Sequence, residues 1–185
     1  MIRVFLVRHG QPDRSIGARR EWKLSRFGRN QAEHAAEELE RFGPLEVISG
    51  PQPRCRESAD YAAKKFRQTV SVEPRLGEIE APSGTADANE WLRRLASPEA
   101  GLKWPQLDQR VNAWRNNTIQ AIRDIKADSA VYTHFASINA IMGAALHLDE
   151  TVLCNPDHAS ITEFAVVNGD IRLVMDGKQI VGPNE

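Results

Sequence analysis

The chain has little cysteine, two residues in 185, and no long uninterrupted hydrophobic run. Cys55 and Cys154 lie far apart and outside any metal-binding or redox spacing, so we expect reduced, buried thiols and no disulfide framework. The apolar start over residues 1–7 is interrupted by Arg3 and is too short for a signal-peptide core. The most apolar stretch, residues 135–148, falls short of the roughly 20 residues that cross a bilayer. These absences exclude disulfide-stapled and membrane-spanning proteins and predict a soluble, cytoplasmic protein with no membrane partner.

An excess of charge of one sign is also lacking, since the formal net charge is −1. The charge is nevertheless unevenly placed: residues 1–30 carry a balance of +6, and the rest of the chain carries −7. The near-neutral total argues against a nucleic-acid binder, whereas the cationic first segment favours an anionic ligand. The basic groups of that segment are Arg3, Arg8, Arg14, Arg19, Arg20, Lys23, Arg26 and Arg29.

Short apolar runs alternate along the chain with segments of helical period. At about 150 residues per domain, 185 residues predict a single domain. The alternation indicates βαβ units, and therefore an α/β three-layer sandwich with a mostly parallel central sheet and helices on both faces. Prolines and glycines interrupt the pattern around residues 77–106, which predicts a small lid-like excursion there. We expect strands over residues 2–7, 45–49, 70–72, 130–133, 160–167 and 171–175, helices over residues 25–42, 54–66, 88–96, 107–125 and 138–145, and a hairpin turn at Asn168-Gly169.

Polar side chains directly follow several of the predicted strands. Arg8 and His9 follow the first strand, and Ser49 and His134 end or follow later ones. In such sheets ligands bind outside the carboxyl ends of the strands, so residues 9 and 134 can meet at one edge. Guanidinium groups match phosphate oxygens, which makes Arg8 and Arg54 natural clamps. A neutral His9 can attack phosphorus through one ring nitrogen if the other donates to a carbonyl, so these residues predict a phosphate pocket.

Five short motifs occur in order along nearly the whole chain. Taken alone, Arg8-His9-Gly10 is equally compatible with a surface or packing role, but the complete order is more specific. The motifs are Leu6-Val7-Arg8-His9-Gly10-Gln11; Leu24, Ser25, Gly28 and Gln31-Ala32; Ser49, Pro51, Arg54 and Ala59; Leu76 and Glu78; and Thr133-His134. This order resembles the histidine phosphatase superfamily, the phosphoglycerate mutase-like proteins.

The resemblance implies a phosphoglycerate mutase-like fold and a two-step phosphoryl transfer that needs no metal and no other cofactor. His9 would take the phosphoryl group, and Glu78 would protonate the leaving oxygen and then activate water. The implied catalytic residues are His9, Glu78 and His134. The implied phosphate-binding residues are Arg8, Arg54, His134 and Gln11, the last with a turn role as its alternative.

The chain departs from the family pattern at several positions. Phe135 stands where most members have glycine, which predicts an apolar wall beside the phosphate that restricts bulky substrates. Ile138 stands where arginine is common. The segment after Glu78 lacks the usual pattern, so Glu80 is a rival proton donor. The position of Glu78 in the motif makes Glu78 the preferred candidate. Ser58 stands where threonine is common and keeps the hydroxyl group.

Three further groups have both a functional and a structural interpretation. His158, just before a predicted strand, either lines the pocket or is structural. Loop cations form either an entrance for a phosphate dianion or an ordinary solvated loop: Arg14, Arg19, Arg20 and Lys23. The tryptophans fit core or lid packing better than a stacking platform, because no basic-aromatic alternation accompanies them: Trp22, Trp91, Trp104 and Trp114.

The leading functional hypothesis is a cofactor-independent phosphatase that hydrolyses phosphomonoesters or phosphohistidine through a phosphohistidine on His9. One alternative is a phosphoglycerate mutase-type phosphotransferase, which the altered segment after Glu78 disfavours. The other is an inactive member of the family that binds a phosphorylated ligand, which Phe135 motivates. The expected partner is a phosphorylated small molecule or phosphoprotein; the sequence does not distinguish them, and it leaves the oligomeric state open.

Overall fold

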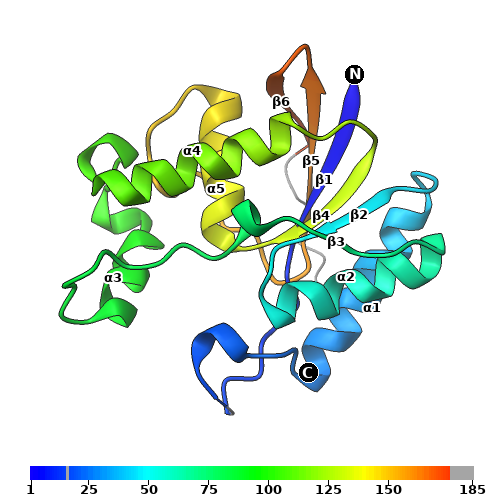
Figure 1. The fold of residues 1–185 in the computed structure, drawn as a ribbon, viewed down its shortest axis with the longest axis horizontal. Helices are drawn as coiled ribbons and strands as arrows, with labels where there is room; N and C mark the ends of the chain where they lie inside the picture. The colour runs from blue at the N-terminus through cyan, green and yellow to red at the C-terminus, as the bar shows by residue number, and fades with distance from the viewer. Residues whose placement is uncertain (16, 176–185) are drawn as a thin grey trace.

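The described residues form one six-stranded sheet. The computed structural model describes residues 1–15 and 17–175, and its strands lie in the order β3-β2-β4-β1-β5-β6 (Figure 1). The strands are β1 (Ile2–Arg8), β2 (Glu46–Ser49), β3 (Ser71–Val72), β4 (Ser129–Thr133), β5 (Ile161–Val167) and β6 (Asp170–Met175). The strands β3, β2, β4 and β1 run parallel to one another, while β5 is antiparallel to both β1 and β6. The predicted mostly parallel sheet is confirmed.

Helices cover both faces of the sheet (Figure 1). On one face lie α1 (Arg26–Glu40) and α2 (Pro53–Phe66), and on the other lie α4 (Gln109–Arg123) and α5 (Phe135–Leu146). Alternate residues of β1 serve the two cores: Val4 and Leu6 pack with α4 and α5, and Phe5 and Val7 pack with α1 and α2. All four side chains are fully buried, as an unbroken apolar strand predicts. The predicted three-layer sandwich is therefore confirmed.

Short-range sequence signals set the boundaries of several elements. Ser25 caps α1, because its hydroxyl oxygen accepts a hydrogen bond from the Gly28 N–H at 2.9 Å. Asn168 and Gly169 have φ angles of 53° and 85°, the left-handed pair that a type I′ hairpin turn needs. They join β5 to β6 as predicted, and β5 of this hairpin pairs with β1 on the side away from β4.

Helix α5 begins at Phe135, one turn before the predicted start at residue 138. The apolar period begins only at Ile138, since Phe135 and Ala136 are half-buried. His134 has an extended backbone, with φ −117° and ψ 164°, and it joins β4 directly to the helix. The sequence boundary was therefore wrong, and the correction matters because it leaves His134 between a strand end and a helix start.

Residues 77–106 form an excursion that lies away from the strands (Figure 1). It contains α3 (Ala88–Leu95) and two short 3₁₀ turns, Pro98–Ala100 and Trp104–Gln106. Ile79, Leu95 and Trp104 are buried in a small core that also takes Val111 of α4 and Ala140 of α5. The excursion is thus packed against the two helices on that face, and its lid-like role stays a prediction.

The described ranges contain no disulfide, no metal-type cluster of side chains and no helix that could cross a membrane. Cys55 is buried, as expected, whereas Cys154 is only half-buried, and neither forms a disulfide within residues 1–15 and 17–175. Within those same ranges, histidine, cysteine and carboxylate side chains form no group of three that could hold a metal. None of the helices in that part of the chain is both long enough and apolar enough to cross a membrane.

Candidate active site

His9 and His134 lie together at the carboxyl edge of the sheet. β1 and β4 are parallel neighbours in which Arg8 pairs with Thr133, so the next residue of each strand emerges at the same edge. The His9 N–H donates to the Thr133 carbonyl at 3.0 Å, and the two imidazole centroids are 5.2 Å apart. Register between parallel strands therefore brings two histidines that are distant in sequence into one site.

The His9 ring is held as a neutral imidazole. Its side chain lies almost entirely out of solvent, and Nδ1 lies 2.8 Å from the Gly10 carbonyl oxygen, which can only accept. Nδ1 therefore carries the proton and donates, which leaves the lone pair on Nε2. Burial lowers the pKa of His9 well below its usual value, and the positive charges beside it, including Arg54, act in the same direction. The ring is neutral at physiological pH.

The backbone that follows His9 is fixed by close contacts. The Gly10 N–H donates to the Ser58 hydroxyl at 3.0 Å, and that hydroxyl donates to the Arg54 carbonyl at 2.7 Å. A side chain at Gly10 would place its Cβ 2.3 Å from the Gly28 carbonyl oxygen, so only glycine fits there. Gly10 thus ties the loop that carries His9 to α2 and packs it closely against the start of α1.

Arg54 is the most buried cation of the site, with 1% of its surface exposed. It lies in the first turn of α2, which starts with Pro53. Its guanidinium group donates to His9 Nε2 at 3.2 Å, to the Arg19 carbonyl at 3.0 Å and to Glu78 Oε2 at 2.7 Å. One side chain therefore connects the nucleophile candidate, the cationic loop and the proton-donor candidate.

Arg8 reaches the pocket from the end of β1. Nη1 donates to the Pro156 carbonyl at 2.7 Å, and the guanidinium carbon lies 5.5 Å from the centre of the Phe135 ring. Its Nε is buried and has no hydrogen-bond partner among the described residues. Burial lowers the pKa of Arg8 to about 10, so the group remains cationic at neutral pH. A buried N–H without a partner beside an open pocket can donate to an anionic ligand.

His134 is held in position by contacts with α2 and with the loop before α2. Its Nε2 lies 2.9 Å from Gln52 Oε1, and the Cys55 thiol lies 3.4 Å from the same nitrogen. Since an amide oxygen can only accept, Nε2 carries the proton, and Nδ1 is directed towards Arg54 Nη2 at 3.4 Å. Burial lowers the pKa of His134 to about 3 despite the neighbouring Glu78 carboxylate.

Glu78 and Glu80, the two proton-donor candidates, have different surroundings. Glu78 lines the pocket and binds Arg19 through both oxygens, at 2.9 and 3.2 Å, in addition to Arg54. Burial alone would raise the pKa of Glu78, but the Arg19 hydrogen bond and the surrounding positive charge hold it at about 2. Glu80 is exposed and pairs with Arg20 outside the pocket. The structure thus brings Glu78 to His9 and leaves Glu80 at the surface.

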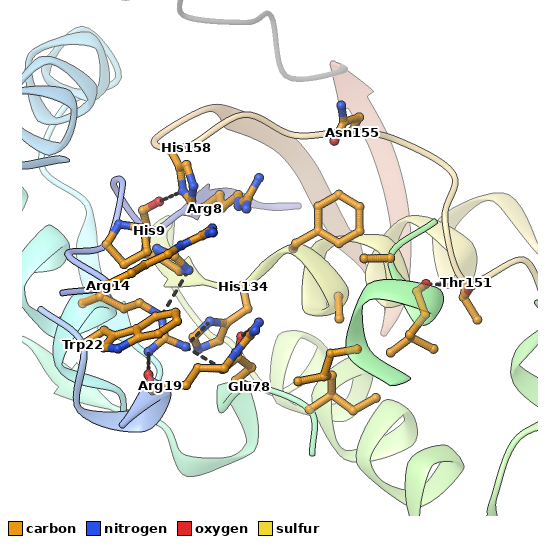
Figure 2. Close-up of a pocket in the computed structure, with 18 residues that line it drawn as sticks. Arg8, His9, Arg14, Arg19, Trp22, Glu78, His134, Thr151, Asn155 and His158 are labelled. Atoms are coloured by element: carbon orange, nitrogen blue, oxygen red, sulfur yellow. Dashed lines mark hydrogen bonds and ion pairs between the residues drawn. The ribbon is translucent and has the colours of Figure 1, made fainter. Parts of the chain in front are cut away.

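These side chains line a pocket of about 300 Å³ (Figure 2). Gln11, predicted to bind phosphate, is not among the described lining residues; its amide oxygen accepts from the Ser25 hydroxyl at 3.0 Å. The lining residues are Arg8, His9, Pro12, Arg14, Arg19, Trp22, Arg54, Glu78, Ile79, Leu92, Leu95, Ala96, His134, Phe135, Ala136, Thr151, Asn155 and His158.

The pocket also contains residues for which the sequence allowed two interpretations. Nδ1 of His158 donates to the His9 carbonyl at 3.1 Å, and burial lowers the pKa of His158 to about 4. Arg14 and Arg19 lie over the Trp22 ring, 5.8 and 5.9 Å from its centre, and all three line the pocket. For His158 the usable signal was its position just before a strand that pairs with β1.

A second set of lining residues had no role assigned from the sequence: Leu92, Leu95, Ala96, Ala136, Thr151 and Asn155. Most come from the excursion or the loop before β5, whose positions depend on tertiary packing. Phe135, by contrast, lies at the pocket wall where the sequence predicted it.

Histidines, arginines and a carboxylate at the carboxyl edge of an α/β sheet are typical of a site that handles phosphate esters. The family model for the histidine phosphatase superfamily (branch 1) matches residues 4–177. The chain therefore belongs to this superfamily, as its motif order predicted.

Similar proteins include both mutases and phosphatases. A 2,3-bisphosphoglycerate-dependent phosphoglycerate mutase from Thermoplasma acidophilum is 28% identical over 183 residues, 90% of this chain and 88% of that protein. A glucosyl-3-phosphoglycerate phosphatase from Mycobacterium tuberculosis is 35% identical over 80 residues, 41% of this chain but only 36% of that protein. The crystal structure of phosphoserine phosphatase from Entamoeba histolytica with 3-phosphoglyceric acid has a TM-score of 0.72 at 22% identity, covering 97% of this chain and 98% of that one. This last likeness shows the fold.

Proposed function

We propose that this protein is a cofactor-independent phosphatase that hydrolyses a phosphomonoester through a phosphohistidine on His9. The observation that carries the proposal is the state of the His9 ring. Nδ1 is anchored to the Gly10 carbonyl, Nε2 holds the lone pair, and burial keeps the ring neutral. A neutral imidazole whose lone pair faces an arginine-lined pocket is the nucleophile that phosphohistidine formation requires.

The phosphate group of the substrate takes the place that Glu78 occupies among the cations. Arg54 presently donates to both His9 and Glu78, and Arg8 holds a buried Nε without a partner in the described part of the chain. A phosphate dianion offers oxygens to Arg8 and Arg54, and it competes with the Glu78 carboxylate for the same guanidinium groups. The dianion also favours a proton on Nδ1 of His134, which can then donate to a phosphate oxygen. Binding therefore frees Nε2 of His9 for attack.

The same exchange allows Glu78 to take up a proton from solvent. Without ligand its pKa is about 2 because Arg19 and other cations stabilise the carboxylate. A dianion beside it weakens those contacts and adds like-charge repulsion, and both effects raise the pKa of the carboxyl group. Glu78 is then protonated when the phosphate is bound, which is the state that a general acid needs.

The reaction proceeds in two steps. His9 Nε2 forms a bond to phosphorus while the bond from phosphorus to the ester oxygen breaks, and the Glu78 proton passes to that oxygen. Glu78, now a carboxylate, takes a proton from water as the water oxygen attacks phosphorus, and the phosphorus–nitrogen bond breaks. Phosphate leaves and His9 is again neutral. Arg8, Arg54 and His134 hold the transferring oxygens throughout.

We further propose that the chain works as a single histidine phosphatase domain in which residues 77–106 act as a lid over the pocket. Ile79, Leu92 and Leu95 of this segment line the pocket, and Leu95 also packs in the small core against α4 and α5.

The pocket volume of about 300 Å³ supports a small phosphorylated molecule as substrate in preference to a folded phosphoprotein surface.

A phosphoglycerate mutase activity is the second candidate, and the 28% identity to the Thermoplasma mutase over 90% of this chain favours it. A mutase returns the phosphoryl group to a hydroxyl acceptor, whereas a phosphatase gives it to water. The two activities share the phosphohistidine and differ only in the acceptor. Isomerisation of 3-phosphoglycerate faster than its hydrolysis would reverse the ranking.

The experiment measures hydrolysis of p-nitrophenyl phosphate in the presence of EDTA by the wild type, His9→Ala and a matched control, His34→Ala. His34 lies on the exposed face of α1 and is not among the residues that line the pocket. We expect His9→Ala to lose at least about 10³-fold in kcat, with the wild type and His34→Ala unaffected by EDTA. Acid-labile ³²P should appear on the wild type and not on His9→Ala. Turnover that survives in His9→Ala, or that requires a divalent metal, refutes the proposed mechanism.

A further inference from the structure

The pocket has two chemically different halves. Figure 2 shows His9, Arg14, Arg19, Trp22, Glu78 and His134 gathered on one side, whereas Thr151 and Asn155 lie on the opposite side. The remaining lining residues, apart from Arg8, Arg54, Pro12 and His158, are apolar: Ile79, Leu92, Leu95, Ala96, Phe135 and Ala136. The cationic half accounts for the phosphate, so the apolar half faces the group that leaves with the ester oxygen.

The apolar half offers little to a charged leaving group. Among its described lining residues none is charged, and the Thr151 hydroxyl is already engaged, since it donates to the Leu95 carbonyl at 3.2 Å. Asn155 is exposed to solvent. A carboxylate or second phosphate placed there would lose its hydration without gaining a cation. Arg14 and Arg19 do not compensate, because they lie over Trp22 on the phosphate side.

The apolar surface belongs to ordered elements. Asp87 caps α3 through hydrogen bonds from the Asn89 and Glu90 N–H groups, both at 2.9 Å. The helix directs Leu92 and Leu95 to the pocket, and Leu95 is buried. Phe135 also lines the pocket, and the Arg8 guanidinium carbon lies 5.5 Å from the centre of its ring. The leaving group therefore meets a fixed hydrophobic surface.

We propose that the substrate is a small phosphomonoester whose leaving alcohol carries an uncharged apolar group, such as a phenyl or branched aliphatic group, and no second anion. The proposal rests on the proposed phosphatase function and specifies its substrate class. The apolar group lies between α3 and Phe135 while the phosphate lies against Arg8, Arg54 and His134. Substrates with a carboxylate near the ester oxygen are disfavoured because Arg8, which contacts Phe135, is engaged by the phosphate, and the described lining residues offer no other cation in the apolar half.

The experiment compares three alkyl esters whose leaving oxygens are similar: 3-phenylpropyl phosphate, O-phosphoserine and 3-phosphoglycerate. We expect kcat/KM for the phenylpropyl ester to exceed that of either carboxylate-bearing ester by about 10²-fold, since a few buried methylene-sized groups discriminate to that extent. Equal or lower kcat/KM for the phenylpropyl ester overturns the proposal.

A charge-introducing variant tests whether the apolar half is responsible. Ala96 lines the pocket, is exposed and follows the end of α3, so Ala96→Arg can be accommodated without disturbing the core. We expect it to lower kcat/KM for the phenylpropyl ester at least tenfold and to raise it for 3-phosphoglycerate. Ala88→Arg is the matched control, because Ala88 is exposed at the other end of α3 and is not a lining residue. Identical preferences in the two variants overturn the assignment.

Binding of phosphonates separates this proposal from the proposed function. Calorimetry with 3-phenylpropylphosphonate and 3-phosphonopropanoate measures the preference without turnover, and we expect the phenyl compound to bind the wild type more tightly by at least tenfold. Absence of His9-dependent turnover with every ester refutes the phosphatase function alone. Tighter binding of the carboxylate compound refutes the substrate class, whether or not turnover occurs.

Discussion

Arg54 donates a hydrogen bond from Nε to Nε2 of His9 across 3.2 Å, so the atom proposed to attack phosphorus is already in contact with the buried cation. The two residues come from separate elements, the first turn of α2 and the end of β1, and Ser58 and Gly10 tie those elements together. The contact orients Nε2 towards the position where a phosphate group bound by Arg54 would lie.

Replacing Arg54 with lysine should lower kcat/KM by roughly 10²- to 10³-fold, the usual cost of losing one fixed donor in a transition state. A lysine is a single point charge and cannot contact His9, Glu78 and the Arg19 carbonyl together, as the guanidinium group does. Steady-state kinetics with p-nitrophenyl phosphate measures the loss. Arg56→Lys, at an exposed position on the same helix, is the control. A similar small effect in both variants would contradict the role given to Arg54.

Glu78→Gln should slow the phosphorylation of His9 by alkyl phosphates by about 10²-fold or more and that by p-nitrophenyl phosphate much less. The alkyl leaving oxygen needs a proton from Glu78 in this first step, whereas nitrophenolate leaves without one. Single-turnover measurement of alcohol or nitrophenolate release gives the dependence of this step on the leaving group, apart from the later attack of water. Glu80→Gln should leave both rates unchanged, because Glu80 pairs with Arg20 outside the pocket. A leaving-group dependence in Glu80→Gln would transfer the proton-donor role to that residue.

Ser58→Ala should destabilise the protein by about 1–3 kcal/mol, because the buried Gly10 N–H would lose its acceptor. Urea unfolding followed by circular dichroism measures the free energy of unfolding. Ser58→Thr keeps the hydroxyl group and should retain more of the stability than the alanine variant. If alanine and threonine cost the same, packing rather than the hydrogen bond fixes the loop after His9.

Acid should weaken the fold over a range set by the buried histidines. Burial lowers the pKa of His134 to about 3 and that of His158 to about 4, and it holds the pKa of His9 well below its usual value. In the unfolded chain each histidine binds a proton below about pH 6.5. As the pH falls from about 6.5 towards 4, the unfolded state binds more protons than the folded state, so the free energy of unfolding decreases. Glu78, with a folded pKa of about 2, adds to the decrease below about pH 4.5.

His158→Asn should make that decrease shallower by about 1.4 kcal/mol per pH unit between pH 6 and 4.5, roughly the contribution of one histidine. Asparagine keeps a donor for the His9 carbonyl, which His158 Nδ1 now contacts at 3.1 Å. Urea unfolding at a series of pH values supplies the slope, with the exposed His34→Asn as control. An unchanged slope in His158→Asn would show that this histidine is protonated in the folded state.

Much of the fold was readable from local patterns. The unbroken apolar run in β1 indicated a strand buried on both faces, and Asn168-Gly169 indicated the hairpin. The position of His9 and His134 after two strands was enough to expect them at one edge, because parallel strands present their carboxyl ends together. The start of α5 was misplaced, since Phe135 faces the pocket and adds nothing to the apolar period of the helix.

The rest of the candidate site depends on tertiary packing. Leu92 and Ala96 belong to the short helix that the sequence predicted over residues 88–96, but only the packing of this segment against α4 and α5 brings it to the pocket. Trp22 was expected in the core or lid, yet it lies beside Arg14 and Arg19 at the pocket. The low pKa of Glu78 also had no sequence signal, because it requires Arg19 and Arg54 to converge on one carboxylate.

The two halves of the pocket come from different kinds of structure. The ends of β1 and β4 and the start of α2 hold the phosphate half in the framework of the sheet, while the excursion around α3 supplies much of the other half. Mutations in α3 can therefore alter which ester is accepted without touching the groups that transfer phosphate. After gene duplication, such a chain can acquire a new substrate through a few replacements in one surface helix, and the same helix is the place to begin directed evolution.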